Sequence, residues 1–164
     1  MSISYDLYPY VIYHFKLKVD DKGLEELEKN ISKHFSEQEI LNLDSEIETI
    51  DFGKFDSYIL GKIEYVKRLE EILIKCEAPY LAYDIMPQLW DMEDVSFITE
   101  YGEEDPNPEL THEFFPDFKS TNQRINEILQ QICDKRYTKD DVLDKINEKG
   151  INSLNKLNKY ILNK

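Results

Sequence analysis

Glycine is scarce in this sequence of 164 residues, and its five glycines stand far apart, at Gly23, Gly53, Gly61, Gly102 and Gly150. A phosphate-binding loop needs several glycines within a few residues, and a nucleophile elbow needs a glycine on each side of its serine. The sequence contains neither pattern, which excludes nucleotide-binding enzymes and hydrolases of those kinds. We therefore expect a protein that is not an enzyme and that carries no cofactor.

Cysteine is rarer still, and histidine is dispersed. Cys76 and Cys133 occupy apolar positions of expected helices, so we predict two buried, reduced thiols. His14, His34 and His112 lie far apart, and no two cysteines or histidines have the close spacing that a zinc site requires. We expect no metal site.

Long apolar runs are also missing. No stretch approaches the ~20 apolar residues that a membrane-spanning helix needs, and residues 1–6 lead into a tyrosine-rich stretch without the basic and apolar regions of an export signal. The sequence predicts a cytoplasmic protein without a membrane partner.

Basic residues are absent from one long segment. Residues 76–118 contain 12 acidic residues and no lysine or arginine, whereas residues 1–75 carry 16 acidic and 10 basic residues and residues 119–164 carry 6 and 10. The net charge of −14 repels nucleic-acid phosphates and anionic membranes, so we expect no direct nucleic-acid partner. It favours a basic protein partner, although acidity also serves solubility.

Hydrophobic periodicity predicts the elements of the first half. The pattern favours a strand at 11–19, a helix at 23–35, two strands around Gly53, a helix at 64–77 and a strand at 80–85. Ser36 and Glu39 have the spacing of a capping box, which favours a short second helix or a turn after the first helix. His14 lies on the mixed face of the first strand beside two lysines, so we expect it to be exposed.

The second half is harder to assign before residue 119. Residues 95–101 favour another strand, and residues 102–117, with three prolines and many acids, favour a long ordered loop. After that, the spacing predicts a helix beginning near Lys119, a helix at 139–149 that Thr138 caps and Gly150 ends, and a last short helix from Asn155 to Leu162.

Together these elements predict an α+β fold with a mostly antiparallel sheet and helices packed on one face, followed by a C-terminal helical segment. We expect an α+β domain at residues 1–118, including an acidic, loop-rich segment at 87–117. Residues 119–164 would form helices packed on it or appended to it.

The C-terminal sequence DDVLDKINEKGINSLNKLNKYILNK, within residues 139–164, resembles a short helical-hairpin motif. That motif occurs on otherwise unrelated Bacteroidota proteins, including cytoplasmic tails of some rhomboid-family proteins, and it carries no known chemistry. The matching residues are Leu143, Asp144, Lys145, Ile146, Gly150, Ser153 and Leu154. Asn155 and Asn158 replace the Thr and Glu of the motif's last cap, and a generic helical hairpin explains the pattern equally well.

The basic-free segment combines acidic residues with aromatic ones, a composition typical of protein interfaces. We predict partner binding by Trp90, Asp91, Glu93, Asp94, Glu100, Tyr101, Glu103, Glu104, Asp105, Glu109, His112 and Glu113. The alternative is that the aromatic residues belong to the core and the acids form a solvated rim.

The preferred function is that of an immunity or inhibitor protein that neutralises a basic toxin or nuclease domain. Two alternatives stay open. One is a regulatory adaptor that docks through its C-terminal hairpin, and the other is an enzyme of unrecognised type with a site at Asp105, Glu109, His112 and Glu113, where carboxylates flank an imidazole.

Overall fold

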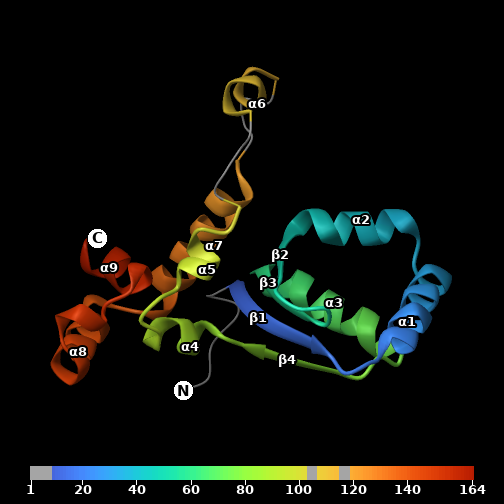
Figure 1. Cartoon of the computed structure of the whole chain (residues 1–164), viewed down its shortest axis with the longest axis horizontal. Helices are drawn as coiled ribbons and strands as arrows, with labels where there is room; N and C mark the ends of the chain where they lie inside the picture. Colours follow the sequence, from blue (N-terminus) through green and yellow to red (C-terminus); the bar gives the residue numbers. More distant parts are fainter. Residues whose placement is uncertain (1–8, 103–106, 115–118) are drawn as a thin grey trace. The chain divides into compact units, whose positions relative to one another are not determined.

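The computed structural model describes residues 9–102, 107–114 and 119–164 and divides the chain into two compact units, Met1–Pro87 and Gln88–Lys164 (Figure 1). The first unit holds the sheet, and all the secondary-structure elements described in the second are helices. The fold is α+β, with an antiparallel sheet and C-terminal helices, as the sequence predicts.

The sheet of the first unit has four antiparallel strands in the order β2-β3-β1-β4. The strands are β1 (Tyr10–Leu17), β2 (Ile47–Asp51), β3 (Asp56–Lys62) and β4 (Tyr80–Asp84). The helical connection after β1 leads to β2, and a hairpin then places β3 between β1 and β2. A second helical connection carries the chain from β3 past β1 to β4, which makes a split β-α-β arrangement. The outer strands of the sheet are therefore β2 and β4.

Three helices connect these strands: α1 (Asp21–His34), α2 (Glu37–Glu46) and α3 (Ile63–Lys75). Periodicity predicts the first and the third, and the capping box indicates the second. Asp20 caps α1 by accepting a hydrogen bond from the Gly23 amide at 2.7 Å. Ser36 caps α2 in the same way through the Glu39 amide, so the expected short second helix is confirmed.

One face of the sheet packs against these helices. Val11, Tyr13 and Phe15 alternate along β1 and are buried together with Leu27 of α1 and Val66 of α3. This is the period-two pattern that the sequence predicts for the first strand. The opposite face carries the intervening residues of each strand, including His14.

The second unit begins within a short helix, α4 (Met86–Asp91), and continues through α5 (Ser96–Thr99) and α6 (Pro108–Phe114). The expected strand at 95–101 is wrong. Val95, Ile98 and Thr99 are buried at a spacing of three and four residues, and the Asp94 side chain starts the helical turn by accepting a hydrogen bond from the Ser96 amide.

The expected loop at 102–117 is also wrong where the structure describes it, because residues 108–114 are helical. Pro108 stands at the first helical position, where the missing amide proton costs nothing, and Glu109 lies in the first turn. Pro108 therefore marks a helix start rather than a helix-free segment.

The remaining helices, α7 (Thr121–Arg136), α8 (Lys139–Lys149) and α9 (Lys156–Leu162), agree with the pattern. Ser120, Thr138 and Asn155 cap their N-termini, and Gly150 ends α8 at a positive φ of 86°. The chain divides after Pro87 rather than after Phe118, because α5 packs against α7 within the C-terminal unit.

Candidate functional site

The predicted binding residues fall in the helical unit, and most of those described are exposed. Exposed carboxylates line the short stretch from α4 to the end of α5: Asp91, Glu93, Asp94 and Glu100. Glu109 and Glu113 are exposed on α6. Glu103, Glu104, Asp105 and the side chain of His112 lie outside the described residues, so the cluster expected around His112 stays a prediction.

Apolar side chains are exposed between these carboxylates. Met92 is 39% exposed, Phe97 is 41% exposed and Tyr101 is 39% exposed. Globular proteins usually bury side chains of this size, and several close together in sequence indicate a contact surface. We call residues Asp91, Met92, Glu93, Asp94, Phe97, Glu100 and Tyr101 the acidic surface.

Trp90 differs from the other predicted residues, because it is buried. Its ring stacks on that of Tyr137, with 3.8 Å between the ring centroids and 1° between the planes. The indole is thus part of the packing of the helical unit, and it anchors the acidic surface rather than forming its outer face.

Three side chains of the C-terminal hairpin hold the carboxyl end of α4. Lys145 Nζ donates hydrogen bonds to the Trp90 carbonyl at 2.7 Å and to Asn158 Oδ1 at 2.8 Å. Asn158 Nδ2 also donates to the Trp90 carbonyl, and Asn155 Nδ2 donates to the Leu89 and Met92 carbonyls at 2.8 and 2.7 Å. These bonds satisfy carbonyls that a helix end leaves without intrahelical partners.

The end of α5 is held in a similar way by α7. Asn122 and Asn126 both donate through Nδ2 to the Thr99 carbonyl, the second at 2.9 Å. Asparagine side chains from later helices therefore fix both short helices of the acidic surface. Sequence inspection missed this role, and the one signal for it was an asparagine at the expected cap of the last helix.

Charges on the acidic surface are only partly compensated. Lys156 Nζ lies 2.5 Å from Glu100 Oε1, in an exposed ion pair. The amide hydrogen bond from Ser96 lowers the pKa of Asp94, which keeps this carboxylate charged. Lys145 is buried, and burial lowers its pKa, while Asp91 and Glu93 act in the opposite direction.

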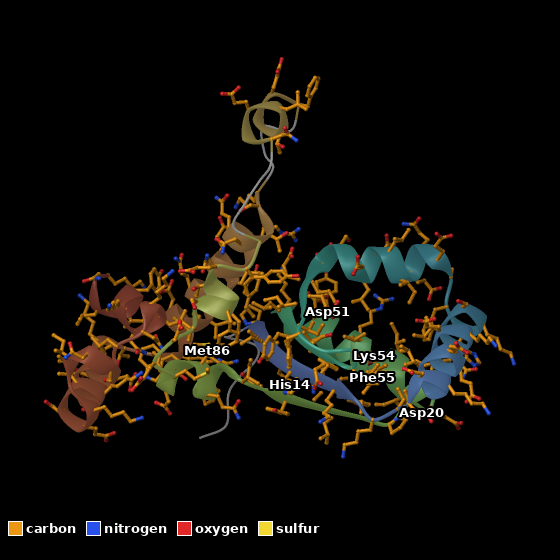
Figure 2. The ribbon with its side chains drawn as sticks, in the orientation of Figure 1. His14, Asp20, Asp51, Lys54, Phe55 and Met86 are labelled. Carbon is orange, nitrogen blue, oxygen red and sulfur yellow. The ribbon has the colours of Figure 1, made fainter. Side chains whose placement is uncertain are left out.

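A second cluster lies on the face of the sheet opposite Val11, Tyr13 and Phe15, and sequence inspection missed it. His14, labelled in Figure 2, lies on β1. Its strand partners are Tyr58 of β3 and Tyr83 of β4. His14 Nδ1 lies 2.7 Å from the Tyr83 hydroxyl, and Nε2 lies 3.0 Å from Asp56 Oδ1. The side chain is only 16% exposed, so the expectation of a solvent-exposed histidine is wrong.

Aromatic rings surround this histidine. Phe52 stacks on Tyr58 at a centroid distance of 4.2 Å, and the His14 ring lies 5.2 Å from Phe52. Burial raises the pKa of Tyr58, and Tyr83 and Asp56 add to that effect. The strand register creates the cluster, because residues far apart in sequence become cross-strand neighbours.

The chemistry of this cluster follows from its hydrogen bonds. An ionised Asp56 can only accept, so Nε2 of a neutral His14 carries the proton and Nδ1 accepts from the Tyr83 hydroxyl. In this arrangement the carboxylate orients the imidazole, and the imidazole can polarise the Tyr83 phenol, as an oriented base does to the nucleophile of a catalytic triad. The cavities of about 390, 250 and 230 Å³ in the same unit are lined by other residues, from α1 to α3 and the segments that flank them.

The remaining observations concern thiols, metal ligands and membrane-spanning helices among the described residues. Cys76 and Cys133 are buried free thiols, as predicted, and burial raises the pKa of Cys133 to about 12. Across residues 9–102, 107–114 and 119–164, no three His, Cys, Asp or Glu side chains are placed to hold a metal ion. None of the described helices is long and apolar enough to cross a membrane.

We compared the chain with models of protein families, with curated proteins and with solved structures, and none of them matches it.

Proposed function

We propose that the chain is a protein-binding protein whose acidic surface holds a basic protein partner. The observation that supports this proposal is the alternation of exposed apolar side chains with exposed carboxylates between Asp91 and Tyr101. The apolar groups would supply buried area, and the carboxylates would steer and orient a partner of opposite charge.

The structure of the helical unit suits such a role. The carboxyl ends of α4 and α5 are fixed by side chains from α7 to α9, so the acidic surface is preorganised. A preorganised surface loses little conformational entropy when it binds. The absence of lysine and arginine from residues 76–118 leaves the surface with few charges that would compete with the partner.

Within this class we favour an immunity or inhibitor protein that acts in the cytoplasm on a basic toxin or nuclease domain. Neutralising such a partner needs fast association, which a net charge of −14 promotes by long-range attraction. It needs no catalytic group on the chain. The His14 cluster plays no part in this proposal.

The C-terminal hairpin supports this function from within the unit. Three of its side chains make buried polar contacts and are at most 5% exposed: Lys145, Asn155 and Asn158. These three residues therefore position the acidic surface and are not available to an external partner.

The test is affinity capture from the native cell with the tagged full chain, followed by titration of the captured protein in purified form. We expect a basic partner whose affinity falls steeply as the salt concentration rises. The variant Glu93→Lys/Glu100→Lys should weaken its binding by at least about tenfold through charge reversal at the contact. The variant Phe97→Ser should weaken binding with an unchanged salt dependence.

The matched control reverses two exposed acids on α1 in the other unit, Glu25→Lys/Glu28→Lys, with the same change in net charge. Circular dichroism and urea midpoints establish that each variant is folded. Equal binding by the control and by Glu93→Lys/Glu100→Lys would assign the effect to net charge alone and exclude the acidic surface as the contact.

A further inference from the structure

Three side chains from three strands form a chain of hydrogen bonds that ends at a tyrosine hydroxyl. His14 Nδ1 lies 2.7 Å from the Tyr83 hydroxyl, and His14 Nε2 lies 3.0 Å from Asp56 Oδ1. Because the ionised Asp56 accepts the Nε2 proton, the lone pair of Nδ1 is directed at the Tyr83 hydroxyl. A nucleophile bonded to a base that a third group orients is the arrangement by which proteins activate a weak nucleophile.

The three side chains are exposed to different degrees. The side chain of His14 is 16% exposed and that of Asp56 is 27% exposed. Tyr83 lies on the outer strand β4 and is 42% exposed. The base and the group that orients it are therefore largely enclosed, whereas the phenol is open to a molecule from solution.

His14 also contacts a second tyrosine, Tyr58, but in a different way. The two rings meet edge to face, with 5.7 Å between their centroids, while both ring nitrogens of His14 lie within hydrogen-bond distance of Tyr83 and Asp56. Burial raises the pKa of Tyr58, and Tyr83 and Asp56 raise it further, so Tyr58 keeps its proton. The base is therefore directed at one of the two tyrosines, Tyr83.

The surroundings of the Tyr83 hydroxyl favour an uncharged reactant with an apolar part. Leu81 lies two residues before Tyr83 on the same face of β4 and is 46% exposed. Phe52 contacts the His14 ring and is 48% exposed. These side chains offer apolar surface that a short acyl chain can cover. The net charge of −14 repels anionic reactants.

We propose that Tyr83 is a modification site, a nucleophilic tyrosine that takes an acyl group from an uncharged, activated acyl donor. His14 acts as the general base, and Asp56 is the positioning residue that orients it. This reaction goes beyond the proposed function and does not involve the acidic surface, so either proposal can fail without the other.

The reaction has two steps. The phenol oxygen of Tyr83 forms a bond to the carbonyl carbon of the donor while its proton passes to His14 Nδ1, and Asp56 balances the charge of the imidazolium. The bond between the carbonyl carbon and the leaving group then breaks. The leaving group departs with the electron pair and takes the proton from His14, which leaves an acyl ester on Tyr83.

Acetylation of the full chain by N-acetylimidazole, followed by mass spectrometry of its peptides, tests the proposal. Tyr101 is the internal reference, because it is 39% exposed and no described histidine side chain bonds to its hydroxyl. We expect Tyr83 to be acetylated about a hundredfold faster than Tyr101 at pH 7, which is the low end of the effect of a general base. Equal rates at the two tyrosines would overturn the proposal.

Two histidine variants locate the base. His14→Gln should slow the acetylation of Tyr83 by about a hundredfold and leave that of Tyr101 unchanged. The matched control is His34→Gln, at an exposed histidine that ends α1, and it should leave both rates unchanged. Circular dichroism and urea midpoints establish that each variant is folded. An unchanged rate at Tyr83 in folded His14→Gln would contradict the role of His14.

The pH dependence of the original chain keeps the test decisive if His14→Gln does not fold. The titratable and charged groups around His14 are Asp56 and Tyr58 on β3, Tyr83 on β4 and Lys16 on β1. Only a neutral imidazole accepts a proton, so the rate at Tyr83 should rise as His14 loses its proton and then level off.

A tyrosine without a base reacts faster with each pH unit until its phenol ionises near pH 10. Levelling at Tyr83 well below that pH therefore distinguishes assistance by a base from mere exposure. Asp56→Asn keeps the base but weakens its orientation, and it should lower the level rate by about tenfold. A rate at Tyr83 that rises steadily with pH in the original chain would overturn the proposal.

Discussion

At the scale of single residues, Asn158 is the point on which the buried polar contacts of the helical unit converge. It is fully buried, its Oδ1 accepts from Lys145 Nζ and from the Asn155 amide, and its Nδ2 donates to the Trp90 carbonyl. Removing this side chain would leave a buried ammonium group and a buried carbonyl short of partners, which costs more than the loss of an exposed hydrogen bond.

We expect Asn158→Ala to lower the free energy of unfolding by about 3 kcal/mol, because the charge of Lys145 loses one of its acceptors. Urea unfolding followed by circular dichroism measures this change. The control is Asn163→Ala, at an exposed position after α9, which should change the same quantity by less than about 0.5 kcal/mol. Equal effects at the two positions would contradict the role given to Asn158.

Lys145 makes the stability of the chain depend on pH. Its pKa in the folded chain lies below the ordinary value of 10.5, first because burial disfavours its charge, with a lesser contribution from Lys149. Between the lowered pKa and 10.5 the unfolded chain binds more protons at this group, so its contribution to the free energy of unfolding rises with pH.

We therefore compare the original chain with Lys145→Met, which lacks this titration. The difference in the free energy of unfolding between the two should shift in favour of the original chain as the pH rises toward 10.5. Urea unfolding at a series of pH values measures it. A difference that does not change with pH would mean that the folded chain holds Lys145 at an ordinary pKa.

At the scale of elements, the end of α3 shows a local conformation that its residue disfavours. The Ala78 amide bonds to the Leu73 carbonyl and the Glu77 amide bonds to the Ile74 carbonyl, both at 3.0 Å, which is a Schellman motif. The motif requires a left-handed residue, and Glu77 takes that position with a φ of 56°. Glycine adopts this conformation without the steric cost of a Cβ atom.

We expect Glu77→Gly to raise the free energy of unfolding by about 0.5 to 1 kcal/mol, since relief of the strain exceeds the added entropy of the unfolded chain. Thermal and urea unfolding measure the gain. Glu77→Ala removes the same charge but keeps a Cβ atom, so it should not reproduce the gain. If it did, charge rather than backbone conformation would be the cause.

At the scale of the whole molecule, the dominant property is the excess of negative charge. Thirty-four acidic residues against twenty basic ones give a net charge of −14, and repulsion among them opposes the compact state. The lysines that bind Asp21, Glu127 and Glu100 lie in exposed ion pairs, and such pairs stabilise little.

We expect the urea midpoint to rise when salt is raised from about 10 mM to about 100 mM, because the screening length falls from about 30 Å to about 10 Å. The variant Glu25→Lys/Glu28→Lys, with a smaller net charge, should show a smaller rise. A rise that is equal in both proteins would point to salt acting on apolar burial instead.

Elements with a strong hydrophobic period could be predicted from local sequence. The strands around Gly53, the helices of the first unit and the three helices after residue 119 all follow from spacing and caps. The helices α5 and α6 could not be predicted, because α5 has four residues and α6 has seven, which is too few for a period to stand out. Local contacts of Asp94 and the position of Pro108 determine those two helices. The equally short α9 was indicated by its cap residue, Asn155.

The candidate sites divide in the same way. The acidic surface could be predicted, since an excess of acids and aromatic residues is a property of composition. The sequence could not predict which aromatic residue is buried, because the stacking of Trp90 on Tyr137 joins residues far apart in the chain. His14 looked exposed beside two lysines, and only the strand register places Tyr83 and Asp56 against it.

The α+β class, the helical C-terminal segment and the location of the basic-free segment follow from local sequence, because periodicity, capping and charge are local properties. Four features depend on tertiary packing: the strand order, the register of β4, the surroundings of His14 and the hydrogen bonds to the end of α4. Those hydrogen bonds come from Lys145, Asn155 and Asn158. Each of these depends on contacts between residues distant in sequence, and such contacts arise only when the helices and strands pack.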